Sequence, residues 1–260
     1  MSRLLATCAA LVSLSAPPAA HADTGTSGTT FSATFGAARS STDLSGASTE
    51  RPQWSPIVGL EYTRGPFFAS TQRGLGVQFS VADGLGGFVA AAYSAGRKDG
   101  NTKDSPRLVG MGRVQGSPLL LTGAEYVTLG DALSLSVAAA LPSKREQGST
   151  VQLGATVGMP LSGALSGSVS LAATYADRKH AQTFYGVTPQ QSSRSGNPVF
   201  TPGAGWISHQ ATLGLNYSFD KTWSGNASLG REQRTGDASK SPLFPRRAAT
   251  VAAISLTRNF

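Results

Sequence analysis

Apolar and small polar residues alternate along most of this chain, in stretches of about ten residues that continue to the last residue, Phe260. Between Val151 and Met159 the odd positions are apolar, and the even positions are Gln, Gly, Thr and Gly. A period of two places alternate side chains on opposite faces of a β-strand. About 9–11 residues is the length of a tilted strand that crosses a bilayer. The pattern therefore predicts an all-β fold, a transmembrane antiparallel up-and-down β-barrel.

Strand-like segments can be followed back from the C-terminus, and their connectors alternate in length. The expected strands are 31–37, 56–63, 67–70, 75–81, 85–93, 119–129, 133–141, 150–159, 165–176, 207–219, 223–232 and 250–260. The connectors 130–132, 161–163 and 220–222 are tight turns, whereas 179–205 and 236–246 are long. Short periplasmic turns and long outer loops are typical of such barrels, and bacterial single-chain barrels have even strand numbers. We therefore expect 12 strands, with 10 as the alternative.

Aromatic residues support the same architecture because they fall near the ends of the expected strands. They are Trp54, Tyr62, Tyr93, Tyr175, Trp206, Tyr217, Phe219 and Trp223. Amphipathic rings suit the headgroup region, so these positions predict aromatic girdles at both membrane interfaces.

The first 22 residues have the features of a secretory signal peptide: a positive start at Arg3, an apolar core over 4–16, and the cleavage sequence Ala20-His21-Ala22. The expected division is a signal peptide, 1–22, and a barrel, 23–260. No later stretch offers 18 consecutive apolar residues. We therefore expect export and residence in the outer membrane of a Gram-negative bacterium.

The formal net charge of +8 raises the question of a nucleic-acid partner. The basic residues are scattered through expected loops, as at Arg97, Lys98, Lys144 and Arg145, and form no aromatic-rich basic face. No nucleic-acid partner is therefore expected. Basic outer loops suit anionic lipopolysaccharide, so outer-membrane lipid and lipopolysaccharide are the expected surroundings.

The last strand ends in Phe260, preceded at alternate positions by Leu256, Ile254 and Ala252. This ending resembles the signal that the barrel-assembly machinery reads, which makes that machinery an expected partner. Arg258 departs from the pattern, since that position is usually apolar or aromatic.

Two motifs in the last 80 residues resemble the MipA/OmpV family of outer-membrane proteins. The first lies in the long 179–205 connector and comprises Phe184, Tyr185, Gly186, Val187, Thr188, Ser195, Gly196, Pro202, Gly203 and Gly205. The family begins this motif with Tyr-Phe, so the first two residues are swapped here. The second motif comprises Gly236, Asp237, Ala238, Ser241 and Pro242. Residues 54–76 are also similar to the family's second strand and its Gly-rich turn.

The resemblance implies a non-enzymatic scaffold that links a murein hydrolase, a lytic transglycosylase, to a murein synthase. Some family members are described as adhesins. The small polar lumen positions of the expected strands favour an alternative, a passive narrow channel for small solutes. No cofactor is expected under either interpretation.

Catalysis is the third possibility, as a serine hydrolase at the rim. His180 and His209 are expected near the outer rim, where a serine such as Ser192, Ser193 or Ser208 could stand beside one of them, with Asp177 as orienter. With serine so common, such proximity is expected by chance, and we predict that the chain is not an enzyme. Two scattered histidines also argue against a metal site, which needs three or four converging ligands.

Two glutamates within expected strands oppose the apolar positions of their strands. Glu61 lies between Leu60 and Tyr62, and Glu125 precedes Tyr126. A charge that faces lipid costs up to about 2–4 kcal/mol at the bilayer midplane, so both carboxylates are expected in the lumen. There they would either pair with Arg113 or Arg231 or stand in water.

Overall fold

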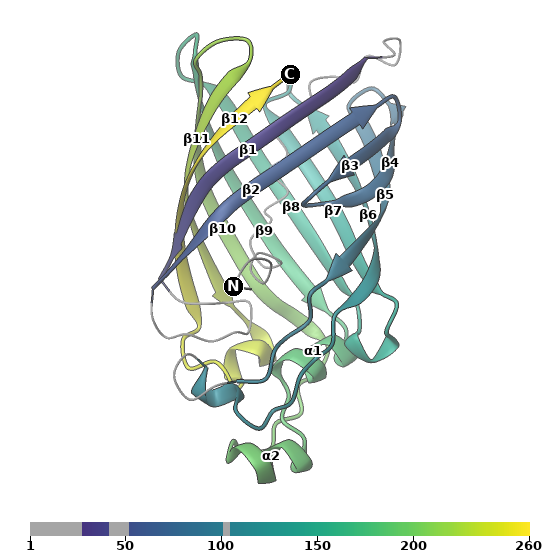
Figure 1. The fold of residues 1–260 in the computed structure, drawn as a ribbon, viewed down its shortest axis with the longest axis vertical. Coiled ribbons are helices and arrows are strands. Elements are labelled where there is room, and N and C mark those ends of the chain that lie inside the picture. The colour runs from purple at the N-terminus through teal and green to yellow at the C-terminus, as the bar shows by residue number, and fades with distance from the viewer. Residues whose placement is uncertain (1–27, 42–51, 101–104) are drawn as a thin grey trace, which may run out of the picture.

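The chain folds into a closed barrel of twelve antiparallel strands (Figure 1). The computed structural model describes residues 28–41, 52–100 and 105–260. Neighbouring strands are consecutive in sequence, and the last strand pairs with the first. The predicted up-and-down barrel and its strand number of 12 are confirmed. The predicted signal peptide, 1–22, lies outside the described residues.

The strands are regular and agree with the expected segments to within a few residues. They are β1 (Thr29–Ser40), β2 (Gln53–Arg64), β3 (Phe67–Ser70), β4 (Gly74–Ala82), β5 (Leu85–Ser94), β6 (Ser117–Thr128), β7 (Leu133–Pro142), β8 (Thr150–Pro160), β9 (Leu165–Ala176), β10 (Gly205–Ser218), β11 (Trp223–Arg234) and β12 (Ala248–Asn259). Within residues 28–41, 52–100 and 105–260, no helix is long and apolar enough to cross a membrane.

The outer face of the barrel carries the large apolar side chains. In β10, Leu213 is 57% exposed and Leu215 is 48% exposed, whereas Thr212 and Gly214, which alternate with them, turn inward and are partly covered. Exposed large side chains on every strand of a closed sheet are the arrangement expected when lipid replaces a protein core. The alternation therefore reports which face meets the bilayer.

Two girdles of exposed aromatic residues border this apolar band. One lies beside the C-terminus and comprises Tyr62, Tyr126, Tyr217, Phe219, Trp223 and Phe260. The other lies at the opposite end and comprises Trp54, Tyr93, Tyr175 and Trp206. Such girdles mark the two membrane interfaces.

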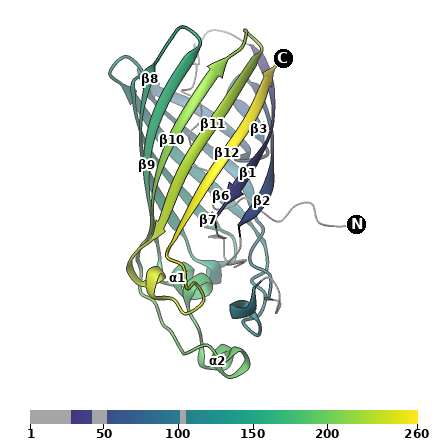
Figure 2. The same cartoon turned by 90° about the vertical axis from the view of Figure 1, so that its left-hand side faces the viewer.

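Connector length distinguishes the two ends of the barrel (Figures 1 and 2). Apart from the β3–β4 turn at 71–73, the tight turns lie at the end that holds the C-terminus, and the long connectors gather at the other end, where the helices are drawn. Short turns on the periplasmic side are typical of these barrels, so the helical end is the outer one.

The C-terminal strand closes the barrel at the periplasmic rim. The Phe260 N–H donates to the Phe31 carbonyl at 2.9 Å. Arg258 faces outward there and places its guanidinium 5.5 Å from the Trp223 ring centre and 4.6 Å from that of Phe260. A cation over aromatic rings at the interface explains how this position accommodates a basic residue.

Candidate functional site: the outer cap and the lumen beneath it

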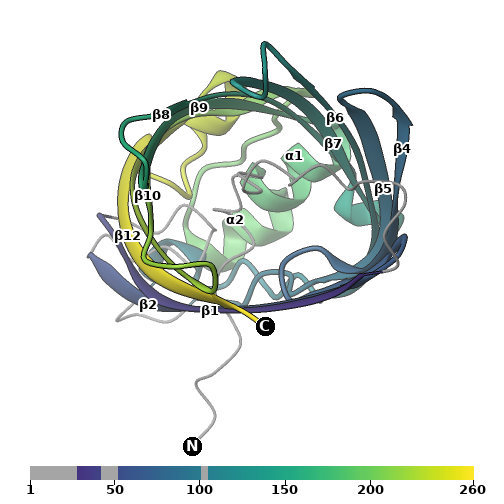
Figure 3. The same cartoon turned by 90° about the horizontal axis from the view of Figure 1, so that it is seen from above.

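The long connectors pack together over the outer mouth and form what we call the outer cap (residues 95–100, 105–116, 143–149, 177–204 and 235–247). It contains the helices η1 (Pro106–Leu108), η2 (Arg145–Gln147), α1 (Arg178–Tyr185), α2 (Pro189–Ser195) and η3 (Gly236–Lys240). Seen along the barrel, α1 and α2 lie across the projected opening (Figure 3). About half of the expected long loop 179–205 is therefore helical.

Local capping explains why such short helices form. The Asp177 carboxylate accepts from the His180 N–H at 2.7 Å and begins α1. Thr188 and Gln191 form a reciprocal capping box around Pro189 at the start of α2. Gly196 ends α2 in the left-handed region, with φ +73°.

A small apolar core holds the cap together. Its buried members are Leu108, Met111, Val187, Leu243 and Phe244, with Tyr185 and Phe200 packed against them. These residues come from three different connectors. A second cluster of Ala176, Ile207 and Ala238 also contacts Tyr185 and joins the cap to the rim of β9 and β10. The cap is thus a packed unit attached to the barrel.

The two family-like motifs meet in this unit. The Gly203 N–H donates to the Asp237 carboxylate at 2.9 Å, and the Ser241 hydroxyl donates to the Tyr185 carbonyl at 2.6 Å. The Asp237 pKa lies below its ordinary value, chiefly because of the bond from Gly203. Motifs that are separate in sequence therefore form one structural site.

Arg97 connects the cap to the β5 side of the barrel. Its side chain is 3% exposed, and it donates to the Phe184 carbonyl at 2.8 Å. Burial lowers the pKa of this arginine, and Asp99 opposes that effect. A buried arginine with a defined carbonyl partner fixes the C-terminal end of α1 across the mouth.

His180 is enclosed within the cap and does not have the surroundings of a catalytic histidine. Burial lowers the pKa of His180 to about 4, against the opposing effects of Asp177 and a hydrogen bond to the Gln147 backbone. Its ring lies 4.5 Å from that of Phe184, centre to centre. The side chain is therefore neutral at physiological pH.

The residues of the hypothetical serine site are dispersed. Asp177 accepts from the N–H and hydroxyl of Ser149, both at 2.8 Å. Burial raises the pKa of Asp177, but these bonds and the one from His180 N–H outweigh it and lower the pKa overall. Ser192 and Ser193 lie on α2, and Ser208 lies in β10. In the described part of the chain, no serine hydroxyl is hydrogen-bonded to the His180 ring.

The lumen contains both predicted glutamates, but with other partners. Glu61 forms an ion pair with Arg73, which follows β3, and Glu125 accepts from the Ser134 hydroxyl. The predicted partners Arg113 and Arg231 were wrong. Arg73 was missed because the turn after β3 returns it to the inner face of β2, which only the strand pairing reveals.

Small polar residues cover the inner face of β8 to β12 and β1. Thr156 and Ser170 are hydrogen-bonded at 3.0 Å, and Thr34 and Thr257 at 2.8 Å. Gln210 and Thr212 continue this lining on β10. This part of the lumen is polar, and its charged side chains, Glu232 and Arg234, lie at the outer end of β11.

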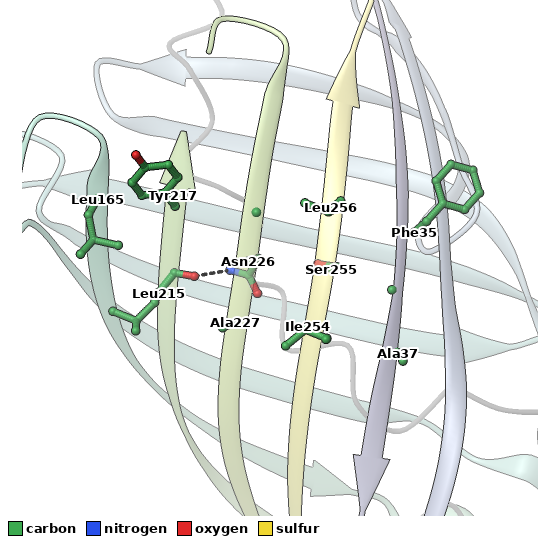
Figure 4. Close-up of a pocket in the computed structure, with 12 residues that line it drawn as sticks. Phe35, Ala37, Leu165, Leu215, Tyr217, Asn226, Ala227, Ile254, Ser255 and Leu256 are labelled. Atoms are coloured by element: carbon green, nitrogen blue, oxygen red, sulfur yellow. Dashed lines mark hydrogen bonds between the residues drawn. The ribbon is translucent and has the colours of Figure 1, made fainter. Parts of the chain in front are cut away.

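The outer face holds a shallow apolar groove over β9 to β12 and β1 (Figure 4). Its volume is about 520 Å³, and Leu215, Tyr217, Phe35 and Leu256 border it. Ala227 is small, which makes the surface concave between these side chains. The groove lies in the lipid-facing band, where acyl chains fill such depressions.

The family model described as "MltA-interacting protein MipA" matches residues 35–260, which is most of the chain. The chain belongs to the MipA family. The match includes both motifs of the cap and all but the first residues of the barrel. No curated protein sequence matches the chain significantly.

Solved structures similar to this MipA-family chain are outer-membrane proteins. Pseudomonas putida OprB is 14% identical, with a TM-score of 0.40, over 80% of this chain and 59% of that one. Vibrio cholerae OmpT is 13% identical, with a TM-score of 0.37, over 84% and 66%. An outer membrane channel of Pseudomonas putida F1 is 10% identical, with a TM-score of 0.43, over 89% and 95%. The chain thus spans about three fifths of OprB and about two thirds of OmpT.

Proposed function

We propose that this MipA-family barrel is a non-enzymatic docking protein that binds an MltA-type murein transglycosylase at its periplasmic rim. A murein synthase is the second expected partner of that rim. The family description supports the first partner, since it names an interaction with MltA. Residues 1–22 act in this proposal as a signal peptide that is removed near Ala22.

The closed outer end carries the proposal. Packed connectors occupy the outer mouth, and the outward side chains of the strands contact lipid. Murein and its enzymes lie on the periplasmic side. The short turns at that end are therefore the surface that a periplasmic enzyme can reach.

The turn 220–222 illustrates how such a surface is pre-organised. Asp220 accepts from the Thr222 hydroxyl and N–H, both at 2.7 Å, and from the Trp223 N–H at 2.8 Å. These bonds lower the pKa of Asp220 and fix the turn. Lys221 makes none of them and projects from a rigid support.

Crosslinking in vivo tests the proposal. Lys221→Glu, which leaves the bonds of the turn in place, is expected to reduce capture of the transglycosylase without changing heat-modifiable gel mobility. Deletion of residues 190–197, which removes most of α2, is the matched control and is expected to leave capture intact. The opposite result would contradict a periplasmic docking surface. In that result the deletion abolishes capture, whereas Lys221→Glu and a replacement of the whole turn leave it intact.

A narrow channel is a second candidate, favoured by the small polar lining of β8 to β12. The width of any passage through the outer cap would limit the conductance of such a channel. Conductance in planar bilayers distinguishes it from a closed scaffold.

A further inference from the structure

The barrel wall is incomplete between β2 and β5, because β3 is only four residues long. β3 pairs with residues 61–64 of β2 and then turns back at Thr71–Arg73 into β4. β2 itself continues to Gln53 and pairs with β1 along its whole length. Near the periplasmic side, β3 and β4 therefore fill the space between β2 and β5. In the outer half of the barrel, none of the described residues forms a strand in that space.

Hydrogen bonding shows where the pairing stops. The Leu60 N–H donates to the Thr71 hydroxyl at 3.1 Å, and the Leu60 carbonyl accepts from the Thr71 N–H at 3.0 Å. Residues two apart in a strand present their backbone groups to the same edge, so Val58, Pro56 and Trp54 face this edge too. Within the described ranges, these three residues have no backbone partner on that side.

Pro56 shows that this edge is suited to remain unpaired. Proline has no N–H and is confined to sheet edges and bulges, where it discourages the addition of another strand. On the other side of the opening, Tyr93 and Ser94 of β5 extend beyond the last residues paired with β4. Three inter-strand spacings separate β2 from β5 in the complete part of the wall, about 14 Å.

The opening lies at the depth of the outer leaflet. Trp54 and Tyr93, one on each side, belong to the outer aromatic girdle and are 70% and 68% exposed. They are more exposed than the other outer-girdle aromatics, Tyr175 at 40% and Trp206 at 42%. A side chain without a neighbouring strand keeps more of its surface exposed. The high exposure of Trp54 and Tyr93 therefore agrees with the absence of strand pairing beside them.

The inner wall beside the opening is more apolar than the inner face of β8 to β12 and β1. Phe68 and Phe88 turn inward, with ring centres 6.3 Å apart, and Arg73 lies 4.3 Å from the Phe68 ring centre. Two glycines make room for these rings: a Cβ on Gly76 would lie 2.7 Å from Phe68, and one on Gly123 would lie 2.7 Å from Phe88.

The apolar surface continues across β5 and β6. Ala92 is paired with Leu119 and Ala90 with Leu121, on the face opposite the lipid-exposed Leu120. We define Phe68, Phe88, Ala92, Leu119 and Leu121 as the apolar stripe. An apolar inner wall beside an opening that faces acyl chains suits a ligand with a hydrocarbon tail.

We propose that the opening between β2 and β5 is a lateral portal, through which a single-chain amphiphile passes from the outer leaflet to the apolar stripe. The outer cap closes the axial route, the opening faces acyl chains, and the stripe receives a hydrocarbon tail. The charged side chains at the end of the opening, Arg73 and Glu61, form an ion pair and so carry no net charge together. This inference is independent of the docking function, which concerns the periplasmic rim.

Photolabelling of the folded barrel in lipid vesicles tests the portal. The probe is a dodecyl carboxylate with a diazirine at the chain end, and labelled residues are identified by mass spectrometry. Leu120 faces lipid and serves as the internal reference. We expect labelling of Leu119 and Leu121 as well as Leu120, and competition by unlabelled dodecanoate at the two inward positions.

Two tryptophan variants distinguish the portal from entry at the periplasmic end. Ala92→Trp places a large ring at the inner side of the opening and is expected to abolish labelling of Leu119 and Leu121 while Leu120 stays labelled. Ala172→Trp places the same ring on the inner face of β9 and is expected to change nothing. Absence of inward labelling in the wild type, or equal inward labelling in both variants, would overturn the proposal. Absence of inward labelling in the wild type overturns the proposal even if Ala92→Trp does not fold.

Discussion

The backbone N–H of Gly203 donates to the carboxylate of Asp237 at 2.9 Å, across 34 positions of sequence. This bond joins the two motifs of the MipA family within the outer cap. Ser241 and Tyr185 form a second link between the same two connectors. We therefore expect the cap to behave cooperatively, so that its parts loosen together when one link is lost.

Asp237→Ala removes the acceptor of the Gly203 N–H and should destabilise the cap by about 1 kcal/mol, since the carboxylate is partly exposed. Hydrogen exchange should become faster at Gly203 and in α2, with the strands unchanged. Lys240→Ala is the control, because it removes only the exposed ion pair with Asp237. Equal acceleration in both variants would mean that the ion pair matters and the backbone bond does not.

Acid should open the cap through His180. Its pKa in the folded cap is about 4, below the ordinary value of 6.5, so an opened cap binds a proton more readily than the closed one. The stabilisation is complete above pH about 6.5 and is lost as pH falls from there toward about 4. Hydroxyl-radical labelling of Phe184, whose ring packs against that of His180, should increase over this range.

His180→Phe keeps an aromatic ring against Phe184 and removes the titrating group. Its labelling at Phe184 should therefore be constant between pH 6.5 and pH 4. Asp177 has a lowered pKa, so its own protonation contributes only at more acidic pH. A variant that retained the full pH dependence would show that another group opens the cap.

Arg97→Ala should increase conductance in planar bilayers, because it removes the buried guanidinium that holds the Phe184 carbonyl across the mouth. Lys98→Ala removes an exposed neighbouring charge of the same sign and should conduct like the wild type. If both variants and the wild type show the same conductance, Arg97 does not hold the mouth closed.

Leu213→Arg should destabilise the barrel by roughly 2–4 kcal/mol, because it places a charge in the lipid-facing band. Thr212→Arg points into the lumen and should cost less. Urea titrations of the barrel in lipid vesicles measure both values. The reverse order would require the opposite orientation of β10.

The strand count and the two faces of the wall were predictable from the sequence because each strand has the same two surroundings. Lipid on one side and the lumen on the other select side chains by local alternation alone. Leu213 and Thr212 could thus be assigned to opposite faces without knowledge of their neighbours. Tight turns such as 220–222 then determined which end is periplasmic.

The sequence by itself determined the barrel, its strand number and its family, since these depend on periodicity and on motifs that can be read in order. Only the tertiary structure decided that Asp237 meets Gly203, that Arg73 pairs with Glu61, and that α1 and α2 form. Helices of eight and seven residues are not stable alone and depend on caps and on packing against distant segments. The opening beside Pro56 likewise depends on where β3 turns back relative to β2, which is a relation between strands and cannot be read from either strand alone.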